Sequence, residues 1–406
     1  MHTRAATYRE VFAVREFHAL FVAHLLSAVG DQFARVALAV LVFDRTRSAG
    51  LTALTYALTF LPSLLAGPLL SGMADRLPRR SVMVVSDLAR MVLVAAMALP
   101  GLPLLAVGAL LVIVQILAAP FNAARAATLP AILDGDRYVV ACTVSNMTYQ
   151  LAQLAGFAVG GVLVGTLGPT EALLLDAATF AASAALVRFG LRARPAAAMA
   201  RTARSRWSRD ITDGAGLVWR DRRLRALVML ASISGFYITV EGLSVPYADE
   251  IGGGPATVGL LMAANPAGTL LGMALISQLA PEHRNQLLGP LAVAACAPLL
   301  GCALHPGLMI TLALWALSGL ASAYQVVANA EFVRSVPDSR RAQAFGLAVT
   351  VLVAAQGVGV VLAGTAADRA GPAMVVAVAG AVGMVAAALA AVSWDRARVS
   401  SVGQQA

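Results

Sequence analysis

Ionisable side chains inside otherwise apolar stretches are the residues of this chain best suited to chemistry. Asp31 and Arg35 lie four residues apart in one such stretch, and Glu241 lies deep in another with no basic residue near it. A spacing of four places Asp31 and Arg35 on one face of a helix, where they neutralise each other in part. A carboxyl group without a partner in a medium of low dielectric constant favours its protonated form. These residues predict reversible proton binding or cation binding; the alternatives are a structural ion pair and a permanently protonated, hydrogen-bonded Glu241.

A second group of charges lies in residues 71–80, between two long apolar stretches. It comprises Asp75, Arg76, Arg79 and Arg80. A short loop this charged cannot lie in lipid, so it marks a water interface. The loop either fixes the membrane topology or controls a conformational change.

The composition shows which elements must position these residues. Of 406 residues, 59% are hydrophobic and 13% are charged, whereas soluble domains have about 25% charged residues. Lipid is therefore the expected solvent for most of the chain. The formal net charge of +9 does not indicate nucleic-acid binding, because the basic residues, all of them arginine, lie in short segments between apolar stretches.

Twelve stretches are long enough for membrane helices, which need about 20 apolar residues. They are residues 17–43, 51–71, 82–100, 102–121, 139–166, 170–190, 224–248, 256–278, 286–304, 307–329, 342–366 and 371–394. The expected fold is an all-α membrane protein with twelve transmembrane helices in two six-helix halves. The predicted domains are residues 1–190, a cytoplasmic linker with a surface helix at 191–223, and residues 224–406.

The distribution of arginines predicts the orientation. With the N-terminus in the cytoplasm, 25 of the 30 arginines lie on the cytoplasmic side and three, Arg45, Arg47 and Arg369, lie outside. Cytoplasmic loops of membrane proteins are enriched in Lys and Arg. Both termini and the linker are therefore expected in the cytoplasm.

Uncharged polar residues within the spans are candidates for a mixed polar cavity, although some of them are expected to form interhelical hydrogen bonds instead. They are Asn146, Tyr149, Gln150, Gln153, Tyr237, Asn265, Tyr324, Gln325 and Gln356. The sequence contains no cluster with metal-ligand spacing, no phosphate-binding loop and no nucleophile motif, so neither an enzyme nor a metal site is expected.

The loop at 71–80 resembles the loop between helices 2 and 3 of the major facilitator superfamily, whose pattern is Gly-x-x-x-Asp-Arg-x-Gly-Arg-Arg. The four charged residues match, whereas Ser71 and Pro78 replace the two glycines. The run continues to Asp87 and Arg90, and it is similar to the drug:proton antiporter branch of macrolide efflux pumps and enterobactin exporters. The resemblance implies a gating loop, with Asp87 and Arg90 as its supporting pair.

Two further stretches bear on this resemblance. Residues 156–161 resemble the superfamily's antiporter motif, with Phe157 where Pro is usual; plain helix packing is the alternative. Residues 364–371 fit the gating-loop pattern at their glycines, but they are expected on the outer side and lack the trailing arginines. We therefore assign them no gating role.

The resemblance implies a secondary active transporter, in particular a proton-coupled exporter of drug-like or amphipathic small molecules. The expected partners are the substrate, protons and the lipid bilayer of the cell membrane. The energy source is the proton gradient, with no cofactor, and a monomer is expected. The alternatives are a facilitative or uptake permease of the same fold and a non-transporting membrane sensor.

Overall fold

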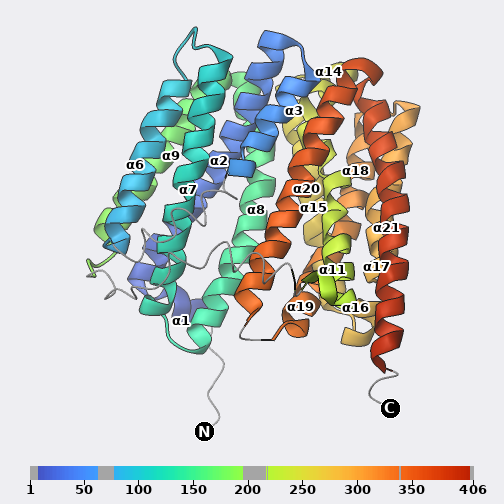
Figure 1. Ribbon diagram of the computed structural model, residues 1–406. Helices are drawn as coiled ribbons and strands as arrows, with labels where there is room; N and C mark the ends of the chain where they lie inside the picture. The colour runs from blue at the N-terminus through green and yellow to red at the C-terminus, as the bar shows by residue number, and fades with distance from the viewer. Residues whose placement is uncertain (1–7, 63–76, 195–215, 217, 338–339, 403–406) are drawn as a thin grey trace. The chain divides into compact units, whose positions relative to one another are not determined.

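The computed structural model describes residues 8–62, 77–194, 216, 218–337 and 340–402. Within these ranges every regular element is a helix and none is a strand (Figure 1). The predicted all-α membrane architecture is confirmed. Most of the linker, residues 195–215 and 217, lies outside the described residues.

Nine helices of the described part of the chain are long and apolar enough to cross a membrane. They span Arg15–Thr46, Leu104–Ile132, Thr148–Thr166, Pro169–Gly190, Arg222–Gly242, Pro255–Ser277, Leu308–Ser335, Gln343–Ala370 and Pro372–Ala397. Two shorter apolar helices, Ala49–Leu58 and Leu288–Leu304, overlap the predicted spans at 51–71 and 286–304. The count of twelve stays a prediction. The helix Arg79–Met97, at the predicted span 82–100, is not among the nine, and residues 63–71 of the predicted second span lie outside the described ranges.

Contacts divide the chain into two compact units, and the division does not follow the sequence midpoint. Unit 1 comprises residues 1–41 and 58–203, and unit 2 comprises residues 42–57 and 204–406. The end of the first long helix and nearly all of the helix after it therefore belong with the C-terminal helices.

Unit 1 is a bundle of long helices. Its helices are α1 (Tyr8–Phe12), most of α2 (Arg15–Thr46), α6 (Arg79–Met97), α7 (Leu104–Ile132), α8 (Asp136–Thr166) and α9 (Pro169–Gly190). Helix α6 packs against α7 and α9 (Figure 1). Asp87 and Arg90 lie on the buried face of α6, so their helix carries charge into the bundle.

Unit 2 contains more and shorter elements. They are α3 (Ala49–Leu58), α11 (Arg222–Ser232), α12 (Ser234–Tyr237), α13 (Thr239–Gly242), α14 (Ser244–Glu250), α15 (Pro255–Ser277), α16 (Pro281–Gln286), α17 (Leu288–Cys296), the 3₁₀ helix η2 (Ala297–Leu304), α18 (Leu308–Ser322), α19 (Tyr324–Ser335), α20 (Arg341–Ala370) and α21 (Pro372–Val402).

The predicted span at 224–248 is interrupted in the structure. It forms α11 to α14, with Ile233, Ile238 and Leu243 at the breaks. Pro246 has no N–H to donate to the carbonyl of Gly242, the residue at which α13 ends. Interrupted membrane helices often line the binding site of transporters, and this one carries Glu241.

Glycines allow a very close contact between α15 and α18 of unit 2. A Cβ atom on Gly268 of α15 would lie 1.8 Å from the carbonyl oxygen of Ala316 in α18. A Cβ atom on Gly319 of α18 would lie 2.0 Å from the carbonyl oxygen of Asn265. The two backbones approach this closely only because both residues lack side chains.

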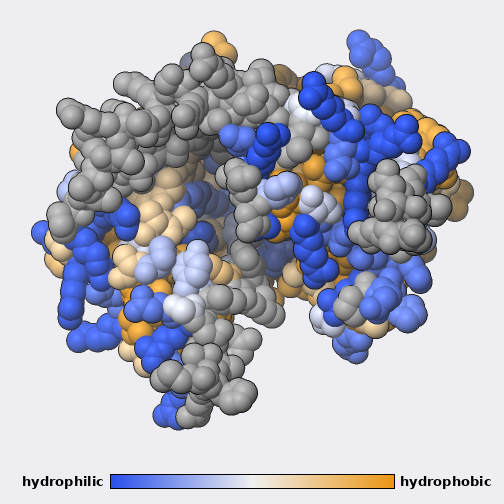
Figure 2. Space-filling model, turned by 60° about the horizontal axis from the view of Figure 1, so that its bottom comes forward, coloured by the Kyte–Doolittle hydropathy of each residue, from blue (hydrophilic) through white to orange (hydrophobic). Residues whose placement is uncertain are grey.

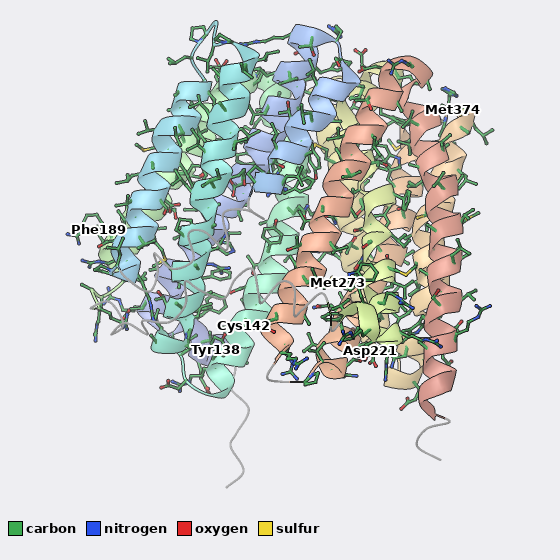
Figure 3. The ribbon with its side chains drawn as sticks, viewed as in Figure 1. Tyr138, Cys142, Phe189, Asp221, Met273 and Met374 are labelled. Carbon is green, nitrogen blue, oxygen red and sulfur yellow. The ribbon has the colours of Figure 1, made fainter. Side chains whose placement is uncertain are left out.

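Large apolar side chains on the outer faces of both units fit a lipid solvent. Phe189 of α9, which is 84% exposed, projects away from unit 1, and Met374 lies at the periphery of α21 (Figure 3). Hydrophilic residues instead gather at the end of unit 2 where α11 begins and α19 ends, as Figure 2 shows from that side. Exposed arginines at this end include Arg222 and Arg334.

Candidate functional site

Arg90 of α6 is the centre of a buried charge cluster in unit 1. Its Nη2 donates to Oδ1 of Asp31 at 2.8 Å, and its Nη1 lies 3.6 Å from Oδ1 of Asp87. The guanidinium lies 4.0 Å from the ring centroid of Phe180, which gives a cation–π contact. Its side chain is 3% exposed, so the charge is held away from solvent by its carboxylate partners and this ring.

Asp31 and Asp87 differ in their access to solvent. The Asp87 side chain is fully buried and accepts a hydrogen bond of 2.6 Å from the hydroxyl of Ser183. The Asp31 side chain is 28% exposed. Asp87 and Arg90 are three residues apart on α6 and share one face, whereas α2 must pack beside α6 to bring Asp31 to the same guanidinium.

A third carboxyl group, Asp176 of α9, belongs to the same cluster. It is 1% exposed, and its Oδ1 lies 3.2 Å from the hydroxyl oxygen of Thr179. A Cβ atom on Gly30 would lie 2.3 Å from this Oδ1, so α9 approaches α2 at the residue before Asp31. Asp31, Arg90 and Asp87 are all within electrostatic reach of Asp176.

The described partner of Asp31 differs from the one that its spacing predicted. The sequence suggested Arg35, four residues away on the same helix. The structure instead describes a bond to Asp31 from Arg90, and Arg35 donates to Oε1 of Gln32 at 3.2 Å. A guanidinium from a neighbouring helix can meet a carboxylate head-on, whereas two side chains of one helix must bend along its surface.

The predicted gating loop is described only in part. Asp75 and Arg76 lie outside the described residues. Arg79 donates to the carbonyl oxygen of Ala127 at 2.7 Å, and Arg80 donates to that of Leu191, the C-cap of α9, at 3.2 Å. Cations near helix C-terminal carbonyls are favourable. Arg80 therefore links the start of α6 to the end of α9.

In unit 2, Glu241 is bonded to a tyrosine. Tyr56 of α3 donates its hydroxyl hydrogen bond to Oε2 of Glu241, and both residues are buried. The carboxyl group was expected inside the membrane without a basic residue on its own helix. Its hydroxyl partner comes from a segment almost two hundred positions earlier in the chain.

A second carboxylate of unit 2 binds the other end of the same short helix. Asp368 of α20 accepts hydrogen bonds from the backbone N–H groups of Ala49 at 2.6 Å and Gly50 at 3.2 Å. The Ser48 hydroxyl adds a bond of 3.1 Å. The carboxylate thus meets the positive end of the α3 dipole. Residues 364–371, to which no gating role was assigned, anchor α3 through Asp368.

Most of the described polar candidates of unit 2 form hydrogen bonds within the unit. The amide of Gln325 donates to the hydroxyl of Tyr237 at 3.0 Å, and Tyr324 donates to the carbonyl of Leu230 at 2.7 Å. Gln356 donates to the hydroxyl of Ser234 at 3.1 Å. Buried Asn265 differs, because its Nδ2 has no hydrogen-bond partner among the described atoms.

The candidates of α8 in unit 1 are less buried. Tyr149 is 40% exposed, Gln150 and Gln153 are partly exposed, and the side chain of Asn146 lies outside those described. On the same helix, a Cβ atom on Gly156 would lie 2.7 Å from Cβ of Gln32. The glycines of this motif therefore serve close packing of α8 against α2.

An apolar cavity of about 270 Å³ lies within unit 2. Two amide side chains, Gln325 and Asn329, and two aromatic rings, Phe332 and Phe345, line it. Its other lining residues are aliphatic: Leu227, Val228, Ala231, Ala328, Ala348, Val349 and Leu352. Ligand sites commonly combine an apolar wall with a few polar groups in this way.

Several residues of these clusters were not among the sequence candidates. Asp176, Phe180 and Ser183 recur every three or four residues, so they share the inner face of α9. That periodicity was readable from the sequence. Nothing in the sequence pointed to Tyr56 as the partner of Glu241, because the pairing depends on the packing of α3 in unit 2.

Comparison with solved structures defines the fold class. The chain is similar to a peptide transporter of the POT family in complex with sulfate, with a TM-score of 0.73, 12% identity and coverage of 97% and 99% of the two chains. It is also similar to a bacterial homologue of the human lysosomal transporter Spinster, with a TM-score of 0.74, 15% identity and coverage of 94% and 96%. These likenesses show that the chain has the same fold as these two proteins.

The sequence comparison is more specific. Residues 8–404 match the profile of a family described as transmembrane secretion effector, and the chain belongs to this family of the major facilitator superfamily. The multidrug efflux pump Tap of Mycobacterium tuberculosis is 26% identical over 372 residues, 87% of each chain. Tap of Mycolicibacterium fortuitum is 27% identical over 375 residues, 87% of this chain and 89% of that protein.

Proposed function

We propose that this membrane transporter exports drug-like or amphipathic small molecules in exchange for protons. The observation that carries the proposal is the buried cluster of Asp31, Asp87 and Asp176 around Arg90. Carboxyl groups inside a membrane are expensive to keep, and in transporters they mark ion and proton pathways. Uphill export needs an energy source, and the proton gradient is the one that such groups can use.

The relatives support the direction and the substrate class. Both are named multidrug efflux pumps and align with most of this chain. The apolar cavity of unit 2, with two amides and two aromatic rings, is suited to one ring system of a lipophilic molecule. Buried Glu241 would add affinity for a cationic group whenever it is ionised.

The remaining parts of the proposal concern oligomeric state, orientation and gating. The chain acts as a monomer in the cell membrane, with both termini and residues 191–223 in the cytoplasm. The loop containing Asp75 and Arg76 gates the cytoplasmic side, and the pair formed by Asp87 and Arg90 supports it. The proton gradient is the energy source, and no cofactor takes part.

The test is transport in everted membrane vesicles, with a dye that reports the pH gradient and a panel of fluorescent lipophilic cations and neutral compounds. Addition of a substrate should dissipate the pH gradient in vesicles that carry the parent protein. Asp31→Asn should abolish uphill export, because the group that exchanges protons at the solvent side is gone, while downhill exchange continues.

Two results would contradict the proposal. Uphill export by the Asp31→Asn variant at the parental rate would remove Asp31 from the coupling mechanism. If the parent protein moves substrate at a rate that does not depend on the pH gradient, it is a facilitative permease.

A further inference from the structure

Asp176 is a buried carboxyl group of the unit 1 cluster that has no ion pair in the described structure. Arg90 already bonds Asp31 at 2.8 Å and lies 3.6 Å from Asp87. If all three carboxyl groups were ionised, one guanidinium would leave two negative charges uncompensated inside the bundle. An uncompensated buried charge is very unfavourable, and such a group takes up a proton instead.

The contacts of Asp176 indicate where that proton lies. The hydroxyl oxygen of Thr179 is 2.7 Å from the backbone carbonyl of Asp176 and 3.2 Å from its Oδ1. A hydroxyl group has one proton to donate but two lone pairs to accept with. If its proton serves the nearer carbonyl, the side-chain contact fits a protonated Asp176 that donates to Thr179.

A second observation places an unsatisfied group in the same cluster. Oδ1 of Asp87 is buried and has no hydrogen-bond partner among the described atoms, although it lies 3.6 Å from Nη1 of Arg90. Nε of Arg90 is likewise buried without a bond. The cluster therefore keeps a spare acceptor and a spare donor, so Arg90 can shift between carboxylates without an additional cation.

We propose that Asp176 carries the transported proton, that Asp31 is its connection to solvent, and that Arg90 is a counter-ion shared among Asp31, Asp87 and Asp176. When Asp176 releases its proton, the new carboxylate attracts Arg90, and the bond from Arg90 to Asp31 weakens. The proton leaves through Asp31, the partly exposed member of the cluster. Asp31 is then free to bind a cationic substrate, and its release returns Arg90 and allows Asp176 to be protonated again.

This inference rests on the proposed proton-coupled export and is tested on the purified full-length chain. A pH indicator in weakly buffered solution reports protons released when the lipophilic cation ethidium is added. Asp176→Asn mimics the neutral carboxyl group in size and should reduce proton release at least tenfold. Its downhill exchange of a neutral lipophilic dye in proteoliposomes, which does not require a free Asp31, should stay within about twofold of the parent.

Two variants complete the experiment. Asp395→Asn, at an exposed position of α21, is the matched control and should release protons like the parent. Thr179→Val removes the hydroxyl beside Asp176, so the pH at which proton release is half-maximal should move while release itself persists. A purely structural role of Asp176 would not produce this shift in pH.

The outcomes separate the inference from the function on which it rests. If the parent releases protons and Asp176→Asn releases the same number, the assignment of Asp176 is overturned and proton-coupled export stands. If the parent transports ethidium without any proton release, the proposed coupling and the assignment of Asp176 fail together. An Asp176→Asn protein that has also lost downhill exchange of the neutral dye would show a structural residue and would overturn the assignment.

Discussion

Carboxyl groups are compensated differently in the two units. In unit 1, Arg90 serves Asp31 and Asp87 and lies near Asp176. In unit 2, Glu241 has the hydroxyl of Tyr56, and Asp368 has the N-terminus of α3. A full positive charge, a neutral hydroxyl and a helix dipole differ greatly in how strongly they stabilise a carboxylate. The comparison therefore predicts which acid tolerates the loss of its partner.

The largest effect is expected from Arg90→Ala. Removing the guanidinium leaves Asp31 and Asp87 without their cation, and breaking a buried ion pair costs about 3–5 kcal/mol. The thermal unfolding midpoint of the detergent-solubilised protein should fall sharply. Arg225→Ala is the matched control, because Arg225 bonds only the carbonyl of Trp219 in the described structure, at an exposed site.

The same measurement on a variant with neutralised acids tests whether unpaired charge causes the loss of stability. The combination of Arg90→Ala with Asp31→Asn and Asp87→Asn should recover much of the lost stability, because the variant no longer buries unpaired charge. An Arg90→Ala protein as stable as the parent would mean that the carboxyl groups of unit 1 are neutral already.

An intermediate effect is expected at Glu241. In Glu241→Gln the amide still accepts the hydrogen bond from Tyr56, so folding should be little affected and affinity for cationic substrates should fall more than affinity for neutral ones. Tyr56→Phe removes the donor and should cost about 1 kcal/mol of stability. Binding of a cationic and a neutral dye to purified protein checks both. Equal losses for the two dyes would exclude Glu241 as a cation-binding group.

A smaller effect is expected at the N-terminus of α3. Asp368→Ala removes the acceptor for the N–H groups of Ala49 and Gly50, and loss of such a cap costs about 1 kcal/mol. The thermal midpoint should fall by a few degrees, whereas Asp44→Ala, at an exposed position near the same helix end, should leave it unchanged. A midpoint unaffected by Asp368→Ala would show that packing alone holds α3.

The smallest effect is expected from Arg47→Ala. Arg47 lies 3.2 Å from Asp249, but the two side chains are 65% and 56% exposed. Exposed ion pairs contribute about 0–1 kcal/mol, so stability and transport should match the parent within error in thermal unfolding and vesicle assays. A loss as large as that of Asp368→Ala would show that this contact does more than its exposure suggests.

The sequence by itself determined the class of structure and the kind of chemistry. Long apolar stretches and short arginine-rich segments sufficed for an all-α membrane protein, and the resemblance of the charged loop to a known pattern added the major facilitator superfamily. They sufficed because bilayer thickness fixes helix length and charge fixes where chains cross the interface. The sequence also marked Asp31, Asp87, Arg90 and Glu241 as charges buried in apolar surroundings.

Only the tertiary structure decided which of these charges meet. Spacing along α2 favoured Arg35 as the partner of Asp31, but helix packing brings Arg90 to it and places Asp176 behind it. Packing also carries Tyr56 and the N-terminus of α3 into unit 2, beside Glu241 and Asp368. Helical periodicity predicts the face on which a side chain lies. It does not predict which neighbouring helix faces it, because that depends on how all the helices of the bundle pack together.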